Sequence, residues 1–471
     1  MKVTSQTLFL ALLLFSIMLR LPVFFPTVMD HDESTYLIIA QQLLQGKIPY
    51  VDNLDVKPVG IYLLFAAILK IWNSIFAIRL FAAIVLAISG YLLYKIHFIL
   101  FSHARVAMVV AFLYLLCANF HKWTWSSNTE VFFQCFSLWA LYILLLARRP
   151  WHFMGFGIVA GIGFLVKFHI VFDVLAFSVF YFFWQGSHLR RWFIDMILAS
   201  AGFCIPIGLL ILTYWKMGFL DELKFAMITI PSGYSSAIDF GRLGKFILEY
   251  YLSYFPILIL VTVGQWVAFR QHWMMRSQWV LFLGWTIFSW IGIAITGKFF
   301  FHYYFQALPV MCLFALTWFM VNYNGFWYGT KVFIRDKIYW IFGLMTVVVW
   351  INQYLQVLRK PDITEMIYKH LEKDWKAGDI IYTTDKNVLY YLLKSDIPTR
   401  YIHTSVIYDD ELIKAYEVDV QKELQQIVDR QIDYYVILKN AHPILEVDIT
   451  ENFRLEKEFP NAVKLYYRIK D

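Results

Sequence analysis

The sequence predicts a polytopic α-helical membrane protein, with about 11 transmembrane helices in residues 1–358 and a small α/β domain outside the membrane in residues 359–471. Hydrophobic residues make up 60% of the 471 and charged residues 16%, whereas soluble domains have about 45–50% and 25%. The apolar residues come in blocks of about 18–22, long enough to cross a bilayer as helices. Charged residues are concentrated in the tail, where these blocks stop.

Each apolar block is predicted as one membrane-spanning helix, because a helix in a soluble core is seldom apolar on all faces over this length. Lys2 and the first block resemble a signal peptide, but no small-residue cleavage site follows, so we expect a retained helix. The predicted spans are residues 7–25, 76–94, 105–118, 131–147, 151–167, 171–184, 193–215, 246–268, 278–296, 303–321 and 338–355.

The charges of the connecting loops predict the orientation. One set of loops is rich in Lys and Arg, as at Arg148-Arg149 and Arg190-Arg191, and the alternate set is rich in Asp and Glu. Loops rich in Lys and Arg stay in the cytoplasm. We therefore expect a cytoplasmic N-terminus, with the acidic loops and the tail outside, in the periplasm or the medium. The expected location is a bacterial inner (plasma) membrane.

The first outer loop, residues 26–75, is long enough to hold a functional site. A helix is predicted over Ser34–Gln45, ended by Gly46. Residues 58–72 are also apolar, and we expect a helix that lies at the membrane surface or enters it partway.

The tail differs from the rest of the chain in charge and in pattern. From Arg359 to Asp471 it carries 17 Lys/Arg and 21 Asp/Glu, a net charge of −4, so the remainder of a chain of net charge +7 carries +11. Helical patterns alternate with strand patterns, which predicts a small α/β domain. The helices are expected at 363–375, 388–393 and 420–429, and the strands at 380–384, 434–438 and 464–469.

The first candidate site is Asp30-His31-Asp32-Glu33, directly after the first span. Ionisable groups at a membrane edge are costly unless they are used. Asp32 comes at the start of the predicted helix, where the helix dipole favours an ionised carboxylate, and a catalytic base must be ionised. The alternative is that Asp32 or Ser34 only caps the helix.

Lysines near outer helix ends give further candidates. Asp55-Val56-Lys57-Pro58 places Lys57 beside a predicted helix N-terminus, which suits a phosphate. The alternative is a lysine that reaches to the lipid interface. Lys298, His302 and Tyr303, at the outer end of the tenth span, offer a cation, an imidazole and a phenol for a lipid phosphate. The alternative is that these residues only belong to the belt of aromatic side chains at the membrane surface.

Two more charged residues stand at outer ends of predicted spans. Glu130 opens the fourth span and can line a cavity or only cap its helix. Lys167 lies with His169 between the fifth and sixth spans, where either can pair with an acidic loop or mark the surface.

Other patterns carry no functional prediction. Gly157-x-x-x-Gly161 is expected to be a close-packing seam between helices. The four cysteines all lie in apolar blocks, so neither disulfides nor a zinc site is expected. The chain has neither a Gly-x-Gly-x-x-Gly turn after a strand nor a Walker loop, so we expect no nucleotide-binding domain. No nucleic-acid partner is expected either.

Taken in order, these motifs resemble the GT-C membrane glycosyltransferases of the protein O-mannosyltransferase and aminoarabinose-transferase type. The resemblance covers residues 1 to about 320. It rests on the first-loop Asp-Glu pair, Gly46 to Tyr50, the Asp-x-Lys-Pro of residues 55–58, Ala77 to Leu80, the Asn-Thr-Glu of residues 128–130, and the His-Tyr-Tyr-x-Gln-x-x-x-Pro of residues 302–309.

The resemblance implies transfer of a sugar from a polyprenyl-phosphate carrier to an acceptor lipid, glycan or protein. It implies Asp32 as the catalytic base with Glu33 beside it, and Lys57 on the donor phosphate. Glu130 would line the same cavity, with Asp30, Asp55 and Lys167 also expected there, and His302 and Tyr303 would contact the donor or a metal.

One position departs from the family pattern. Aminoarabinose-type transferases carry a metal-binding Glu directly before the loop lysine, whereas this chain has Val56 there and Asp55 one residue earlier. A divalent metal is therefore left open, and no other cofactor is expected.

Two other functions remain as alternatives. A transporter or flippase would need ionisable residues near the bilayer midplane and inverted repeats, neither of which is evident. A polymerase or ligase acting on lipid-linked polysaccharide would use a similar outer cavity, and the length of its product would distinguish it.

Overall fold

The computed structural model describes residues 4–234, 239–321, 328–438 and 441–469. The chain forms two compact units, each assembled from three segments, which we describe separately. The helical unit consists of Met1–Phe24, Ile78–Leu212 and Ser236–Arg359. The mixed unit consists of Phe25–Ala77, Thr213–Ser235 and Lys360–Asp471.

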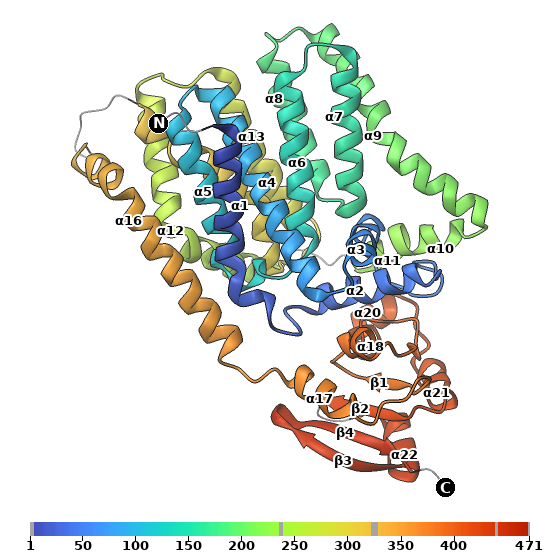
Figure 1. Cartoon of the computed structure of the whole chain (residues 1–471). Helices are drawn as coiled ribbons and strands as arrows, with labels where there is room; N and C mark the ends of the chain where they lie inside the picture. Colours follow the sequence, from blue (N-terminus) through green and yellow to red (C-terminus); the bar gives the residue numbers. More distant parts are fainter. Residues whose placement is uncertain (1–3, 235–238, 322–327, 439–440, 470–471) are drawn as a thin grey trace. The chain divides into compact units, whose positions relative to one another are not determined.

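The helical unit has a buried centre formed by α14 (Leu308–Ala315), all of whose residues are buried. Helices α5, α12 and α13 pack on α14, and α6, α7 and α8 lie side by side (Figure 1). The other elements of this unit are α1 (Ser5–Arg20), α4 (Ile75–Phe101), α5 (Ala104–Phe120), α6 (Thr129–Leu146), α7 (Pro150–Val166), α8 (Ile170–Trp184), α9 (Leu189–Met217), α12 (Phe240–Arg270), α13 (Arg276–Ala294), η4 (Phe301–Ala307), α15 (Thr317–Met320) and α16 (Tyr328–Gln353).

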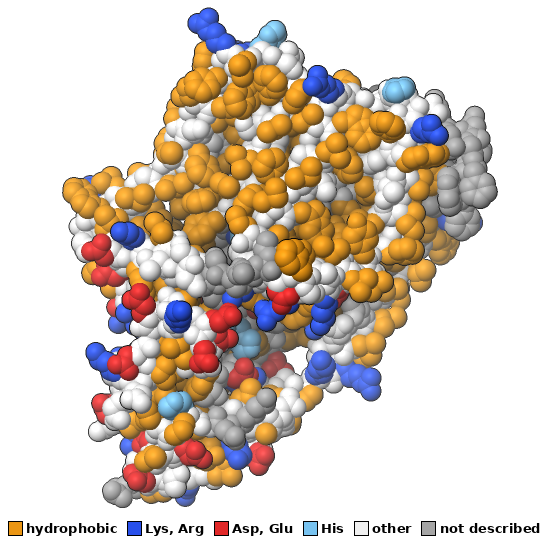
Figure 2. All heavy atoms as spheres, turned by 180° about the vertical axis from the view of Figure 1, so that it is seen from behind, with side chains coloured by type: hydrophobic (Ala, Val, Ile, Leu, Met, Phe, Trp, Pro, Cys, Tyr) orange, Lys and Arg blue, Asp and Glu red, His pale blue; other side chains and the backbone are white. Residues whose placement is uncertain are grey.

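The long helices carry apolar side chains on their surfaces. In the most apolar 18-residue stretch of residues 189–217, which form α9, only 11% of the stretch is buried, and in that of residues 336–358, which include most of α16, only 17% is buried. Figure 2 shows apolar side chains over most of the visible face of the helical unit. Water solvates such a large apolar surface poorly, whereas a bilayer solvates it well. The chain is an integral membrane protein.

The predicted spans all coincide with apolar helical segments. Within the described residues, eight helical segments are long and apolar enough to cross a membrane. The predicted spans at 105–118, 151–167 and 171–184 fall on α5, α7 and α8, which have 17, 17 and 15 residues. A straight crossing takes about 20 residues, so these three helices are short for a bilayer.

The tenth predicted span is not one continuous helix. Residues 301–320 form the 3-10 helix η4, then α14, then α15. An interrupted helix within the membrane is tolerated where protein surrounds it. This condition is met here, because 89% of the most apolar stretch of residues 301–320 is buried. Pro309, near the start of α14, lacks the N–H that a continuous helix would need there.

The Gly157/Gly161 motif forms the predicted seam. A Cβ on Gly157 would collide with the backbone carbonyl of Ala199, and one on Gly161 would collide with that of Phe203, both in α9. Only glycine lets α7 and α9 approach so closely, as small residues do in other membrane helix pairs.

The mixed unit contains a four-stranded sheet in the order β1-β2-β4-β3. β1 and β2 are parallel, with Ile381 opposite Tyr434, and the other neighbours are antiparallel. β3 and β4 form a hairpin with a register shift between Leu455 and Lys457. The strands are β1 (Ile381–Thr383), β2 (Tyr434–Leu438), β3 (Phe453–Phe459) and β4 (Val463–Arg468).

Helices from all three segments belong to the mixed unit. Within it, α18 packs on α2, and α11 packs on α20. These helices are α2 (His31–Leu44), α3 (Gly60–Ile71), α10 (Leu220–Lys224), α11 (Ile230–Tyr234), α17 (Ile363–Leu371), α18 (Val388–Leu393), α19 (Ser405–Tyr408), α20 (Asp410–Ala415), α21 (Val420–Asp429) and α22 (Pro443–Asn452), and a π-helical turn, Phe225–Thr229, joins α10 to α11.

The α/β character predicted for the tail is confirmed, and the compact unit that contains the tail also includes two earlier segments. The predicted helices at 388–393 and 420–429 and the strand at 434–438 have the observed bounds of α18, α21 and β2. The sequence patterns did not reveal β3 and α22. β3 exposes its five central residues, so it lacks the alternation of apolar and polar residues expected of a half-buried strand.

Candidate functional site

The predicted site residues divide between the two units. Asp30, Asp32, Glu33, Asp55 and Lys57 belong to the mixed unit. Glu130, Lys167, Lys298, His302 and Tyr303 belong to the helical unit. They form two clusters, each with its own geometry.

The N-cap of α2 is Asp30, not Asp32 or Ser34. The Asp30 carboxylate accepts a hydrogen bond from the backbone N–H of Asp32 at 2.9 Å, and the Ser34 hydroxyl donates to the Asp30 carbonyl at 3.0 Å. An aspartate that satisfies a first-turn N–H is a strong helix start signal, so α2 begins at His31, three residues before the predicted start. The Asp32 side chain is thus not used as the cap.

Asp32 pairs with Lys57, as the candidate site requires. The Lys57 Nζ lies 3.1 Å from the Asp32 Oδ2, and the two side chains are 24% and 19% exposed. The same ammonium lies 5.8 Å from the ring centre of Tyr36, one helical turn after Asp32. The pair is thus sheltered but open enough for a ligand to reach it.

Two tyrosines fix the backbone around Lys57. The Tyr50 hydroxyl donates to the Lys57 carbonyl at 2.8 Å. The Tyr62 hydroxyl donates to the Asp55 carboxylate at 2.7 Å, and both residues are buried. Asp55 therefore holds α3 against the loop. The predicted site residues did not include Tyr36, Tyr50 or Tyr62. Of these, only Tyr36 had a local signal, because it lies four residues after Asp32 and so on the same face of α2.

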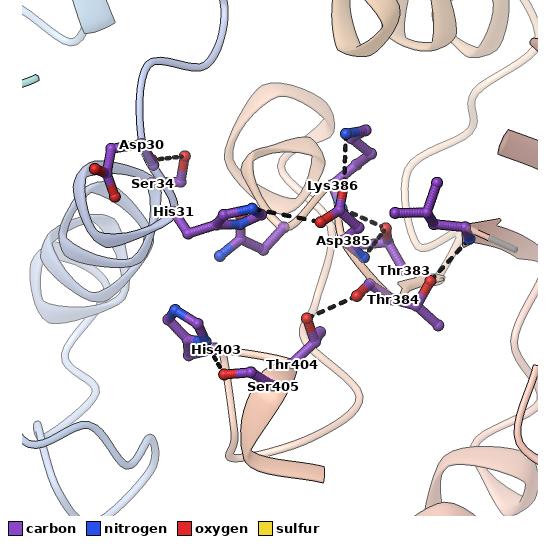
Figure 3. A network of polar contacts seen from close by, with 12 residues as sticks. Asp30, His31, Ser34, Thr383, Thr384, Asp385, Lys386, His403, Thr404 and Ser405 are labelled. Atoms are coloured by element: carbon purple, nitrogen blue, oxygen red, sulfur yellow. Dashed lines mark hydrogen bonds and ion pairs between the residues drawn. The ribbon is translucent and has the colours of Figure 1, made fainter. Parts of the chain in front are cut away.

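The tail contributes residues to this cluster that no sequence pattern revealed. The Nε2 of His31 lies 3.4 Å from the Asp385 Oδ1, and the ring centres of His31 and His403 are 5.9 Å apart (Figure 3). Burial lowers the pKa of His403, with His31 and Lys57 acting in the same direction and Asp32 and Asp55 opposing it. The His403 imidazole therefore stays neutral at pH values where a solvated histidine gains a proton.

We expect His403→Gln to reduce the acid sensitivity of the protein. With its pKa lowered in the folded state, His403 binds fewer protons than in the unfolded state, so its contribution to stability falls as the pH drops below its usual value of 6.5. Glutamine is neutral throughout and does not contribute to this loss. The thermal unfolding midpoint should therefore decline less in the variant than in the wild type between about pH 7.5 and 5.5. An equal decline in both would contradict this account.

The second cluster centres on Glu130 in the first turn of α6. Its carboxylate contacts the Lys167 ammonium, lies 3.6 Å from the His302 Nε2, and accepts a hydrogen bond from the Thr129 hydroxyl at 3.1 Å. Glu130 and Lys167 are 3% and 6% exposed. Glu130 thus does more than cap its helix, and Lys167 is not a surface marker.

Aromatic rings complete the second cluster. Lys167 lies 4.3 Å from the ring centre of Tyr303, whose ring also contacts His169 and His302. Tyr304 is fully buried and donates to the Phe246 carbonyl at 2.9 Å. Tyr304 therefore faces protein, and the rings of His302 and Tyr303 also contact protein groups. Lys298 lies partly buried in the preceding loop.

A buried aspartate fixes the segment that carries His302 and Tyr303. Asp173 in α8 accepts hydrogen bonds from Ser137 at 2.6 Å, Trp285 at 3.1 Å and Gln306 at 3.3 Å. These donors come from α6, α13 and η4, so one carboxylate ties four elements together.

The described residues do not assemble a metal site. No group of three or more His, Cys, Asp or Glu side chains in the described ranges is arranged to hold a metal ion.

Two comparisons bear on the fold. Residues 56–215, about a third of the chain, match the family of dolichyl-phosphate-mannose-protein mannosyltransferases. ArnT from Cupriavidus metallidurans, solved bound to undecaprenyl phosphate, superposes with a TM-score of 0.67 and 13% identity over 98% of each chain. The chain has the GT-C fold. The resemblance inferred from its motifs is confirmed at the level of fold and of the matched segment.

A second solved structure superposes on this chain less closely. The archaeal oligosaccharyltransferase AglB from Archaeoglobus fulgidus, in complex with an inhibitory peptide and a dolichol-phosphate, superposes with a TM-score of 0.51 and 12% identity, over 92% of this chain and 69% of that one. No curated protein matches the chain in sequence. The family match begins just before Lys57 and includes Glu130 and Lys167, but it does not include Asp32.

Proposed function

We propose that this chain is a membrane glycosyltransferase that moves a sugar from a polyprenyl-phosphate carrier to an acceptor lipid, glycan or protein at the outer face of the membrane. The observation that carries the proposal is the Asp32–Lys57 pair, with its atoms 3.1 Å apart, at the N-terminus of α2. It occurs in a chain with the fold of ArnT, which binds undecaprenyl phosphate.

In this proposal Asp32 acts as the general base. The acceptor hydroxyl gives its proton to the Asp32 carboxylate while its oxygen attacks the anomeric carbon of the donor sugar. A bond forms between that carbon and the acceptor oxygen, and the bond to the phosphate oxygen breaks on the opposite side. The configuration at the anomeric carbon is therefore inverted.

Lys57 stabilises the leaving group. A polyprenyl-phosphate sugar is a phosphodiester with one negative charge, and cleavage leaves a phosphomonoester with an additional negative charge. A preorganised ammonium lowers the energy of a transition state in which this charge develops. The Tyr50 hydroxyl, which holds the Lys57 carbonyl, and the Tyr36 ring restrict where the lysine can point.

The helical unit offers a second place where a phosphate or sugar can bind. Lys167 and His302 meet at Glu130, and Tyr303 covers the lysine. Lys298 lies a few residues before His302 and adds a further cation to the segment. We assign donor binding to this cluster as well, with Glu130 holding Lys167 and His302 in place.

The direct test is sugar transfer by the purified protein. Radiolabelled polyprenyl-phosphate monosaccharide would be mixed with an extract of envelope lipids and glycans, in detergent or in liposomes. Transfer of single sugars without added nucleotide sugar supports the proposal. Release of label only as long polysaccharide, or movement of the intact carrier across liposomes without transfer, would contradict it.

We expect Lys57→Met to reduce transfer by about 10- to 100-fold, the loss expected for one charge-assisted contact worth about 1.5–3 kcal/mol. Methionine keeps much of the lysine's length but has no charge. The measurement is kcat/KM for the lipid donor. Lys47→Met is the matched control, because Lys47 is an exposed lysine of the same loop. A similar loss in both variants would show that Lys57 has no special role.

The proposed orientation can be tested separately. The acidic loops and the tail are proposed to lie outside the cytoplasm, as the distribution of Lys and Arg predicts. We expect a membrane-impermeant thiol reagent to label Asp52→Cys in intact cells, in a background whose four native cysteines are replaced by serine. Labelling only after the cells are broken would place the Asp32–Lys57 pair inside and exclude an outer-face reaction.

A further inference from the structure

The first five residues of α2 contact the tail at three places. His31 lies 3.4 Å from Asp385, its ring lies 5.9 Å from that of His403, and the Asn387 side-chain amide donates to the Thr35 hydroxyl at 3.3 Å. Figure 3 shows His31 projecting from α2 toward Asp385, with His403 nearby. Asp32, the proposed base, lies between His31 and Thr35 in the sequence.

The tail side of this contact is itself firmly held. Asp385 follows β1, and the Thr383 side-chain oxygen accepts from the backbone N–H groups of Asp385 at 3.4 Å and Lys386 at 2.8 Å. Lys386 also pairs with the other carboxylate oxygen of Asp385 at 2.5 Å. The Asp385 carboxylate is therefore aimed by groups anchored to the sheet.

The segment that carries His403 is tied to the same strand end. The Thr404 hydroxyl donates to the Thr384 carbonyl at 2.8 Å, and the Ser405 hydroxyl lies 2.5 Å from the His403 Nδ1. Two short tail segments, 383–387 and 403–405, thus form one platform that faces His31 (Figure 3).

We propose that Asp385 and His403 are positioning residues that hold His31 and thereby fix the first turn of α2, so that Asp32 faces Lys57. This inference rests on the proposed function, in which Asp32 is the base. The first turn of a helix lacks intrahelical partners for its N–H groups and is prone to fray. Attachment at His31 and Thr35 restrains that turn, and a misplacement of about 1 Å at a reacting group can cost about 100-fold in rate.

The tail is then part of the reaction centre and not an appended domain. His31 pairs with Asp385, and Asp385 pairs in turn with Lys386. Asp385 binds the His31 imidazole most directly, so its removal should loosen α2 without removing any group that contacts the substrate.

The test compares Asp385→Ala, His31→Ala, the double variant and His31→Lys. We expect each single variant to lower kcat about 10-fold with KM for the lipid donor unchanged, because donor contacts remain. The double variant should be no slower than His31→Ala, since both changes remove one interaction. His31→Lys, which can still pair with Asp385, should recover most of kcat. Asp396→Ala, an exposed carboxylate of the tail, is the control.

A second readout does not depend on activity. Hydrogen–deuterium exchange should become faster for residues 31–36 in Asp385→Ala while exchange in the sheet stays as in the wild type. Unchanged exchange at residues 31–36 would overturn the positioning role, even if the wild type transfers no sugar and the proposed function fails. Full kcat in Asp385→Ala beside an inactive Asp32→Asn would overturn the positioning role while leaving the proposed base intact.

Discussion

Asp32→Asn should lower kcat for sugar transfer by about 10²–10⁴-fold, the range that a positioned general base contributes. The amide has nearly the shape of the carboxylate but cannot accept the acceptor's proton. The α2 cap is provided by Asp30, so the helix should persist in the variant. The measurement is single-turnover transfer from labelled lipid donor, with the thermal unfolding midpoint recorded beside it.

Asp52→Asn is the matched control for this variant. Asp52 lies in the same loop, but its carboxylate accepts from the Ile48 backbone N–H at 2.6 Å. We expect transfer at the wild-type rate in Asp52→Asn. Wild-type kcat in a well-folded Asp32→Asn would remove Asp32 from the mechanism, and the other carboxylates of the first loop would have to be tested in its place.

Glu130→Leu should destabilise the helical unit by about 3–5 kcal/mol, the cost of removing one member of a buried ion pair. In the variant the Lys167 ammonium, 6% exposed, keeps its ring contact with Tyr303 but loses its carboxylate. The check is the unfolding midpoint in a fixed detergent. A stability equal to that of the wild type would mean that the pair is not buried in the protein as it occurs in the membrane.

A second substitution separates pairing from packing. In Glu130→Leu with Lys167→Met both charges are gone, and a buried ion pair replaced by apolar groups often loses little stability. We therefore expect the double variant to be more stable than Glu130→Leu alone. If the loss of stability in the double variant instead equalled the sum of the losses in Glu130→Leu and Lys167→Met, the contact between the two side chains would contribute little energy. Glu130 would then contribute mainly through its shape.

Local sequence signals were sufficient for most of the membrane helices and for selecting Asp32 and Lys57 as candidate site residues, but not for their pairing. Blocks of apolar residues located the membrane helices because a bilayer imposes length and composition directly. Asp32 and Lys57 lie beside the N-termini of helices, where the helix dipole favours negatively charged groups. The start of α2 was nevertheless placed at Ser34 and not at His31, since several capping residues stand side by side at residues 30–35.

The tail's share of the first cluster was not predictable from the sequence. Asn387 and Thr35 are 352 positions apart, and no pattern along one chain encodes such a contact. Asp385 follows the predicted strand at 380–384, but nothing in the sequence indicates that the end of this strand meets α2. Likewise, the break of the tenth span into η4, α14 and α15 depends on surrounding helices, which an apolar block does not reveal.

The three-segment construction of the mixed unit has a consequence for biosynthesis. The ribosome makes Thr35 long before Asn387, and at about 5–20 residues per second the 352 intervening positions take roughly 20–70 s. During that interval α2 and α3 can pack on each other, but α18, which also packs on α2, has not yet been made. Any nascent chain released before the sheet is translated would carry Asp32 and Lys57 but lack Asp385 and His403, so its α2 would have no tail contact at His31.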